Sequence, residues 1–114
     1  MIEQGGSGAD LYTWFAGGTQ ICNGTVNAVY NSNDILDGVW NWPAQFVAPP
    51  PGRSASLQPG TASMTPPVGD IATIGFTAGG TASSKIRMQR VTGGTNFQAG
   101  DTADIYAVAI GRWF

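Results

Sequence analysis

The sequence contains no histidine and a single cysteine, Cys22, among its 114 residues. One cysteine cannot form an intrachain disulfide, and without histidine a His or Cys/His zinc site is excluded. Serine and cysteine nucleophiles also lack the histidine base that usually activates them. Cys22 is therefore expected to be a small buried hydrophobic residue, and we expect no cofactor.

Charge is scarce as well. Only 11% of the residues are charged and the formal net charge is −2, against roughly 25% charged residues in an average soluble domain. A weakly charged surface suits burial in an assembly, and a net negative chain is not expected to bind nucleic acid. A short chain with 17 glycines builds a thin core. Partner subunits are then the remaining common means of stabilisation, because the chain can form neither an intrachain disulfide nor a His or Cys/His zinc site.

Signals for secretion or membrane insertion are missing too. The first ten residues carry no basic region followed by an apolar run, as a signal peptide would. No stretch approaches the roughly 20 apolar residues that cross a bilayer. We therefore expect a protein made in a reducing cytoplasm, not secreted, and without a membrane partner.

Short runs of alternating polarity are typical of β-strands, and no apolar stripe of helical period exceeds two turns. In one run Val26 and Ala28 share a face, and in another Ala72, Ile74 and Phe76 do. The last run is apolar on both faces, as in a strand that is covered on both sides. Gly-Gly-Thr triplets between runs predict turns. The sequence predicts an all-β fold, a small antiparallel β-sandwich or jelly-roll-like barrel, with strands in 11–16, 21–30, 35–42, 71–77, 85–91 and 103–110.

All seven prolines lie between Pro43 and Pro67. Proline lacks a backbone donor, so this stretch is expected to be neither a helix nor a central strand. As polyproline II it would reach roughly 75 Å. We therefore divide a single domain, 1–114, into a Gly-rich N-terminal arm (1–9), a first β segment (10–42), a Pro-rich extended arm (43–69) and a second β segment (70–114).

The arm has three interpretations: a disordered linker, a ligand for proline-recognising domains, or a clamp over neighbouring subunits. Arg53 is its only charge, fewer than the basic flanks that proline-recognising domains favour. The clamp is the prediction that we follow. Its candidate partner-binding residues, including the aromatic C-terminus, are Pro49, Pro50, Pro51, Arg53, Pro66, Pro67, Trp113 and Phe114.

Other residue patterns favour structure over chemistry. The carboxylate pairs Asp34/Asp37 and Asp101/Asp104 stand where aspartate caps turns, and no catalytic motif accompanies them. The oxygen-rich stretch 31–37 lacks the glutamate at the twelfth position of a calcium loop. Lys85 and Arg87 give one strand a basic outer face, suited to solvent or to ion pairs with a neighbour. We predict no enzymatic activity and no metal site.

One run resembles a recurring pattern of β-domains. Phe97-Gln98-Ala99-Gly100-Asp101, which leads into Asp104-Ile105-Tyr106-Ala107-Val108, resembles the last strand of many jelly-roll and β-sandwich domains. The whole chain resembles small virion structural proteins of tailed bacteriophages, such as capsid decoration (cement) proteins and fibre domains. That resemblance implies a non-enzymatic virion protein, often a homotrimer, that binds the major capsid protein or other virion subunits and stabilises a capsid.

An alternative function stays open at this point. Three tryptophans, Trp14, Trp40 and Trp42, could form a stacking platform for sugars if they lay on the surface. The chain would then be a carbohydrate- or receptor-binding β domain, such as a fibre tip. The competing interpretation makes them aromatic residues of the core or of an interface.

Overall fold

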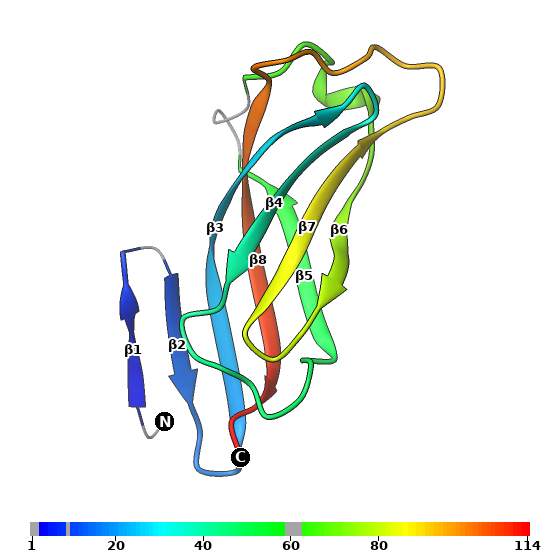
Figure 1. Cartoon of the computed structure of the whole chain (residues 1–114). Helices are drawn as coiled ribbons and strands as arrows, with labels where there is room; N and C mark the ends of the chain where they lie inside the picture. The colour runs from blue at the N-terminus through cyan, green and yellow to red at the C-terminus, as the bar shows by residue number, and fades with distance from the viewer. Residues whose placement is uncertain (1–2, 9, 59–62) are drawn as a thin grey trace.

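A computed structural model of the chain describes residues 3–8, 10–58 and 63–114. Across these residues eight strands form one antiparallel sheet, there is one short 3-10 turn, and no α-helix occurs (Figure 1). The elements are β1 (Glu3–Ser7), β2 (Asp10–Trp14), β3 (Thr19–Ser32), β4 (Ile35–Asn41), β5 (Gly52–Leu57), η1 (Val68–Asp70), β6 (Ile71–Gly79), β7 (Ser83–Arg90) and β8 (Thr102–Arg112). The predicted all-β fold is confirmed.

The longest strand, β3, organises the sheet. One of its edges pairs with β8 from Thr19↔Arg112 to Val29↔Thr102. Its other edge pairs with β2 near the start of β3 and with β4 near its end. The sheet continues from β4 to β7 and β6, and from β8 to β5. It curls until β5 and β6 lie near each other, although no backbone pairing joins these two strands in the described residues (Figure 1).

The core follows the predicted alternation. In β3, Val26 and Ala28 are buried, whereas Val29 points to the other face and is exposed. Successive side chains of a strand point to opposite faces of the sheet. The inward side chains of β3, β4, β7 and β8 are fully buried and meet inside the curled sheet. The core residues are Cys22, Val26, Ala28, Leu36, Trp40, Trp42, Phe46, Ile86, Met88, Phe97, Ala103, Ile105, Ala107 and Ala109.

The predicted face of β6 is partly wrong. Ile74 and Phe76 pack against the core, but Ile71 joins them there and Ala72 is exposed. The pairing of β6 with β7 shifts register between Ile71 and Thr73, which marks a β-bulge. A bulge adds one residue on one strand, so the alternation before it is reversed.

The predicted double coverage of the last strand is not found in the single chain. The inward residues of β8 are fully buried, but Tyr106 is 39% and Ile110 43% exposed on the other face. No element of the described chain packs over these two side chains enough to bury them. One face of β8 is therefore apolar and open.

The predicted extended arm over 43–69 is wrong. The chain after β4 folds back on the body, because the amides of Trp42 and Phe46 donate to the carbonyls of Ala82 and Thr81 at 3.0 and 2.8 Å. Phe46 is only 2% exposed. It lies against Gly111, where a Cβ would come within 2.9 Å of the Phe46 ring. Glycine at 111 thus lets this segment pack against the end of β8.

The prolines border a strand instead of preventing one. The interval between Pro51 and Pro59 has none, and within it β5 pairs with β8 from Gly52↔Ile110 to Leu57↔Ile105. Among the residues that the structure describes, no strand pairs with the other edge of β5, in agreement with the expectation that this region cannot form a central strand. Further along, Ser63 bridges to Thr102. Pro59 and the rest of 59–62 lie outside the described residues.

The N-terminal arm is also corrected in part. Glu3–Ser7 form β1, which pairs with β2 from Glu3↔Trp14 to Ser7↔Asp10. Residues 1, 2 and 9 of the predicted arm lie outside the described residues. Turns are confirmed at the Gly-Gly-Thr triplets, and Gly18 and Gly93 use positive φ values of 95° and 81° there.

Within the described residues, no helix has the length and apolarity that a membrane span requires.

We predict that Phe46→Ala destabilises the protein by about 3–5 kcal/mol, because it empties a buried aromatic site in the core. Val47→Ala is the matched control, since Val47 is the next residue and is 57% exposed. Chemical denaturation of both variants checks this. Similar midpoints for the two variants would mean that this stretch does not belong to the core.

Candidate functional site

The outward residues of β8 and of its two neighbouring strands form one surface of the sheet, with an apolar centre on β8. Tyr106, Val108 and Ile110 point outward from β8, and register places Ile21 of β3 directly beside Ile110. On the other side lie the small residues of β5, with Ser54 beside Val108. We call this surface, formed by the outward residues of β3, β8 and β5, the β8 face.

Charge is nearly absent from the β8 face. In the paired stretch its outward charges are Asp104 near one end of β8 and Arg112 near the other. Asp104 accepts a hydrogen bond from the Asn27 side chain at 2.9 Å, and Arg112 donates to the Gly17 carbonyl at 3.0 Å. Between these ends the face presents aliphatic, aromatic, hydroxyl and amide groups. Such a surface can pack against another protein without burying an unpaired charge.

A groove adjoins the β8 face at the end of β8. It has a volume of about 330 Å³ and is lined by Thr19, Val47, Ala48, Pro49, Pro51, Ile110, Gly111 and Arg112. The two exposed prolines form one wall, and Ile110 belongs to both the groove and the β8 face. Pro50, between them, is instead fully buried. Part of the predicted partner-binding set is therefore next to the open apolar face.

The other predicted partner-binding residues are not part of this groove. The β5–β8 register puts Gly52 beside Ile110, whereas Ser63 bridges to Thr102, so the two proline clusters lie toward opposite ends of β8. Pro66 is buried and Pro67 precedes η1. Arg53 lies over the Phe76 ring, 5.4 Å from its centroid. No single surface contains all eight predicted residues.

The C-terminal aromatic residues are held at the end of the body. Trp113 stacks on Trp14 with ring centroids 4.7 Å apart, and its indole N–H donates to the Phe15 carbonyl at 2.9 Å. Phe114 is 57% exposed and packs edge-on against Trp113. The Arg112 guanidinium lies 5.7 Å from the Phe114 ring centroid.

The predicted tryptophan platform is not present. Trp40 and Trp42 are 2% and 7% exposed and pack edge to face in the core. The Trp40 indole N–H donates to Asp10 at 3.3 Å, and Trp14 stacks on Trp113 instead. Buried rings cannot stack on a sugar, so the core interpretation of Trp40 and Trp42 holds.

The aspartates stabilise turns and strand pairs. Asp101 accepts from the Thr65 and Gln98 amides at 3.0 and 2.9 Å, and from the Thr65 hydroxyl at 3.1 Å. Asp34 pairs with Arg90 at 2.6 Å, and Asp37 lies 3.6 Å from Lys85. No group of three or more acidic, Cys or His side chains in the described part of the chain could hold a metal ion.

Cys22 lies in a buried polar network. Gln20, also fully buried, accepts from the Trp14 indole at 2.6 Å and donates to the Ala44 carbonyl at 2.9 Å. The same Gln20 amide lies 3.5 Å from the Cys22 sulfur. Burial raises the pKa of the Cys22 thiol, which keeps it in the unreactive thiol form. Gln20 thereby ties the segment after β4 to β3.

The geometry defines a small all-β domain whose one long antiparallel sheet curls on itself. No protein-family model matches the chain, and no curated protein does either. Among solved structures it is similar to an N-truncated R1-type pyocin tail fibre, with a TM-score of 0.61. The match covers 96% of this chain and 86% of that chain at 15% sequence identity. At this identity the likeness shows a shared fold.

We predict that Asp101→Ala lowers stability by about 2 kcal/mol, because two backbone amides and a hydroxyl lose their acceptor. Burial of Asp101 favours its neutral form, but these three hydrogen bonds outweigh it and lower the pKa of Asp101. A lowered folded-state pKa means that the stabilisation is present above the unfolded value of about 3.9 and is lost as the pH falls below it.

Thermal unfolding between neutral pH and pH 3 checks this prediction. The difference between wild type and Asp101→Ala should shrink at the acidic end. Asp34→Ala is the control, since Asp34 is 57% exposed and its pair is expected to contribute at most about 1 kcal/mol. A stability difference that stays constant down to pH 3 would contradict the assignment.

Proposed function

We propose that this chain is a non-enzymatic structural domain of a virion or virion-like particle, of the fibre type. The observation that carries the proposal is the open apolar β8 face, which a single chain leaves in solvent. The tail-fibre fold likeness supports the class of protein, because it extends over nearly the whole chain. The low charge, at 11% of residues, supports a surface that is covered in an assembly.

The occupant of the β8 face in this proposal is a second copy of the chain. A large apolar patch on one side of a sheet marks an interaction site more often than a solvent surface. The face bears opposite charges, Asp104 and Arg112, near its two ends and none between them. Copies can therefore pack around their apolar centres while their charged ends stay at the rim, where charge is tolerated.

We further propose that three copies assemble, and that the proline groove lies at the rim of each contact. A homotrimer surrounds a central axis on which three β8 faces could meet. Association with the major capsid protein, and decoration of a capsid as such, remain predictions from the sequence. A fibre-type role in the virion is the version that the tail-fibre fold supports better.

We predict that Ile110→Lys and Tyr106→Lys each weaken self-association by at least about tenfold. Burying an unpaired lysine at an interface costs several kcal/mol, and about 1.4 kcal/mol corresponds to tenfold. Sedimentation velocity over a dilution series measures the change. Both side chains point outward in the single chain, so circular dichroism should show an intact fold.

Val39→Lys is the matched control, because Val39 is 58% exposed and lies on β4, a strand that does not pair with β8. It should assemble as the wild type does. The proposal fails if the wild type sediments as a monomer at its highest soluble concentration. It also fails if Val39→Lys dissociates the protein as strongly as Ile110→Lys.

A further inference from the structure

Three adjoining surface hollows border β6: two lie between β5 and β6, and the third lies over residues of β6 and β7. The first, of about 410 Å³, lies between β5 and β6 and shares Ala55 and Ile74 with the second. The second, also about 410 Å³, shares Gly75 and Phe76 with the third, of about 250 Å³. We call these three adjoining hollows together the β6 groove. Its β5 side shares Ser54 and Ser56 with the edge of the β8 face, whereas its β6 side lies outside that face. The two halves of the groove differ in chemistry.

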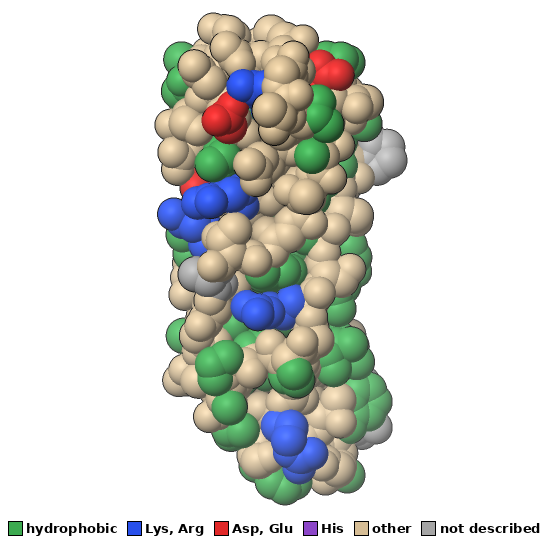
Figure 2. Space-filling view, turned by 90° about the vertical axis from the view of Figure 1, so that its right-hand side faces the viewer, with side chains coloured by type: hydrophobic (Ala, Val, Ile, Leu, Met, Phe, Trp, Pro, Cys, Tyr) green, Lys and Arg blue, Asp and Glu red, His purple; other side chains and the backbone are tan. Residues whose placement is uncertain are grey.

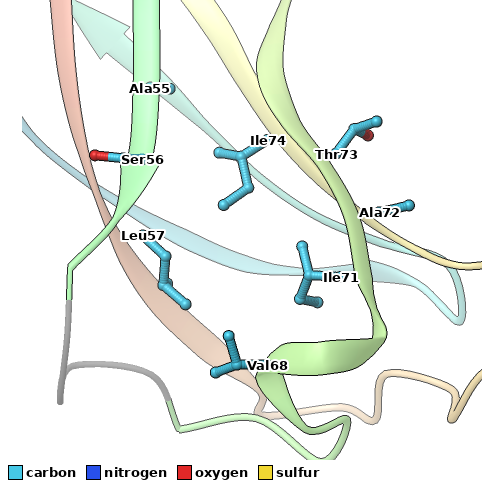
Figure 3. Close-up of a pocket in the computed structure, with 8 residues that line it drawn as sticks. All are labelled: Ala55, Ser56, Leu57, Val68, Ile71, Ala72, Thr73 and Ile74. Atoms are coloured by element: carbon cyan, nitrogen blue, oxygen red, sulfur yellow. The ribbon is translucent and has the colours of Figure 1, made fainter.

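One half of the groove is apolar. Leu57 of β5, Val68 of η1, and Ile71 and Ile74 of β6 line the first hollow, and their side chains converge on the space between the strands (Figure 3). Ala72 and Thr73 point away from it (Figure 3). Leu57, Ile71 and Ile74 also pack against the core, which fixes the floor, whereas Val68 is 62% exposed. This half suits aliphatic side chains of a ligand.

The other half carries two arginines that lack acceptors. Arg53 lies over Phe76 and lines the second hollow, and Arg87 lines the third beside Thr73, Thr77 and Gln89. Neither guanidinium has a hydrogen-bond acceptor or an ion-pair partner among the described residues. The Nε of Arg87 is buried without an acceptor.

The other two arginines both have acceptors: Arg90 pairs with Asp34, and Arg112 donates to the carbonyls of Gly17 and Phe114. Lys85 and Arg90, on the same strand as Arg87, both contact aspartates. A guanidinium has five N–H donors, and a buried donor without a partner costs about 1–3 kcal/mol or more when charged. A carboxylate from outside the chain would satisfy these donors with charge-assisted hydrogen bonds.

The surroundings favour an anionic occupant. Lys and Arg side chains follow the length of this side of the molecule, while Asp and Glu gather toward its upper end (Figure 2). Gly75, which the second and third hollows share, has no atom within 4 Å of the position of a Cβ. A ligand can therefore approach the β6 backbone between the two arginines.

We propose that the β6 groove binds an extended segment of a partner protein, with aliphatic residues at one end and carboxylates at the other. The aliphatic side chains occupy the half around Val68, and the carboxylates pair with Arg53 and Arg87. The stretch 71–77 of β6 spans about 20 Å at the rise of a strand, enough for about six extended residues. This binding goes beyond the proposed self-assembly and does not require it.

An array of immobilised hexapeptides tests the groove, with aliphatic and acidic residues placed in every order. We expect enrichment of peptides whose aliphatic residues come together at one end and whose Asp or Glu residues come together at the other. The best peptide, measured by fluorescence anisotropy, should bind Arg53→Gln and Arg87→Gln about tenfold or more weakly, as expected for loss of a charge-assisted hydrogen bond. Val68→Ser should weaken binding several-fold.

Two matched controls separate the groove from general charge and hydrophobicity. Lys85→Gln removes one positive charge from the same strand, and Val39→Ser removes one exposed valine elsewhere; both should bind like the wild type. The proposal is overturned if the array shows no such enrichment, or if the arginine variants bind unchanged. Equal binding of an oligogalacturonate would also overturn it, because that ligand lacks an aliphatic end and would indicate an acidic saccharide site.

Discussion

The pairing of β3 with β8 is the constraint on which the rest of the structure depends. It joins residues 19–29 to residues 102–112, so closing this ladder brings together segments from near the two ends of the chain and carries the entropic cost of a long loop. β2 and β4 then add to the free edge of β3, and β5 adds to the free edge of β8. Gly111 lets Phe46 and Pro50 pack at the end of the same ladder. The alanines on the inward side of β8 are sufficient here because large side chains such as Trp40, Phe46 and Phe97 fill the rest of the core.

The same ladder produces the asymmetry that we connect with function. Its inward face supplies alanines and Ile105 to the core, and its outward face leaves Tyr106 and Ile110 open. In a chain with neither a disulfide nor a metal cluster in its described part, apolar surface of this kind is available for association. The β6 groove lies where the edge strands β5 and β6 approach each other without pairing. Assembly and partner binding would then occupy adjoining surfaces of one domain, which meet along β5.

Period-two alternation predicted most strands within a few residues, because inward and outward positions differ in polarity along β3, β4, β7 and β8. Alternation could not predict the bulge in β6, because the sequence around Ala72 does not indicate that a residue is inserted there. β1 was missed because Glu3–Ser7 is mostly glycine and polar residues, and becomes a strand only through its pairing with β2. For 43–69, proline content indicated an arm, but the proline-free interval at 52–57 was the informative signal for β5.

The site was predictable in part. Apolar residues on both faces of 103–110 indicated that something covers the outward side of β8, and the structure shows that the chain itself does not. The unpaired state of Arg53 and Arg87 depends on distances to every acceptor, which sequence does not contain. Hydroxyl-radical footprinting of the assembled protein against its dilute form tests the central claim most directly. The account predicts that Tyr106 and Ile110 become protected on assembly while Val39 does not; unchanged reactivity at Tyr106 and Ile110 would contradict it.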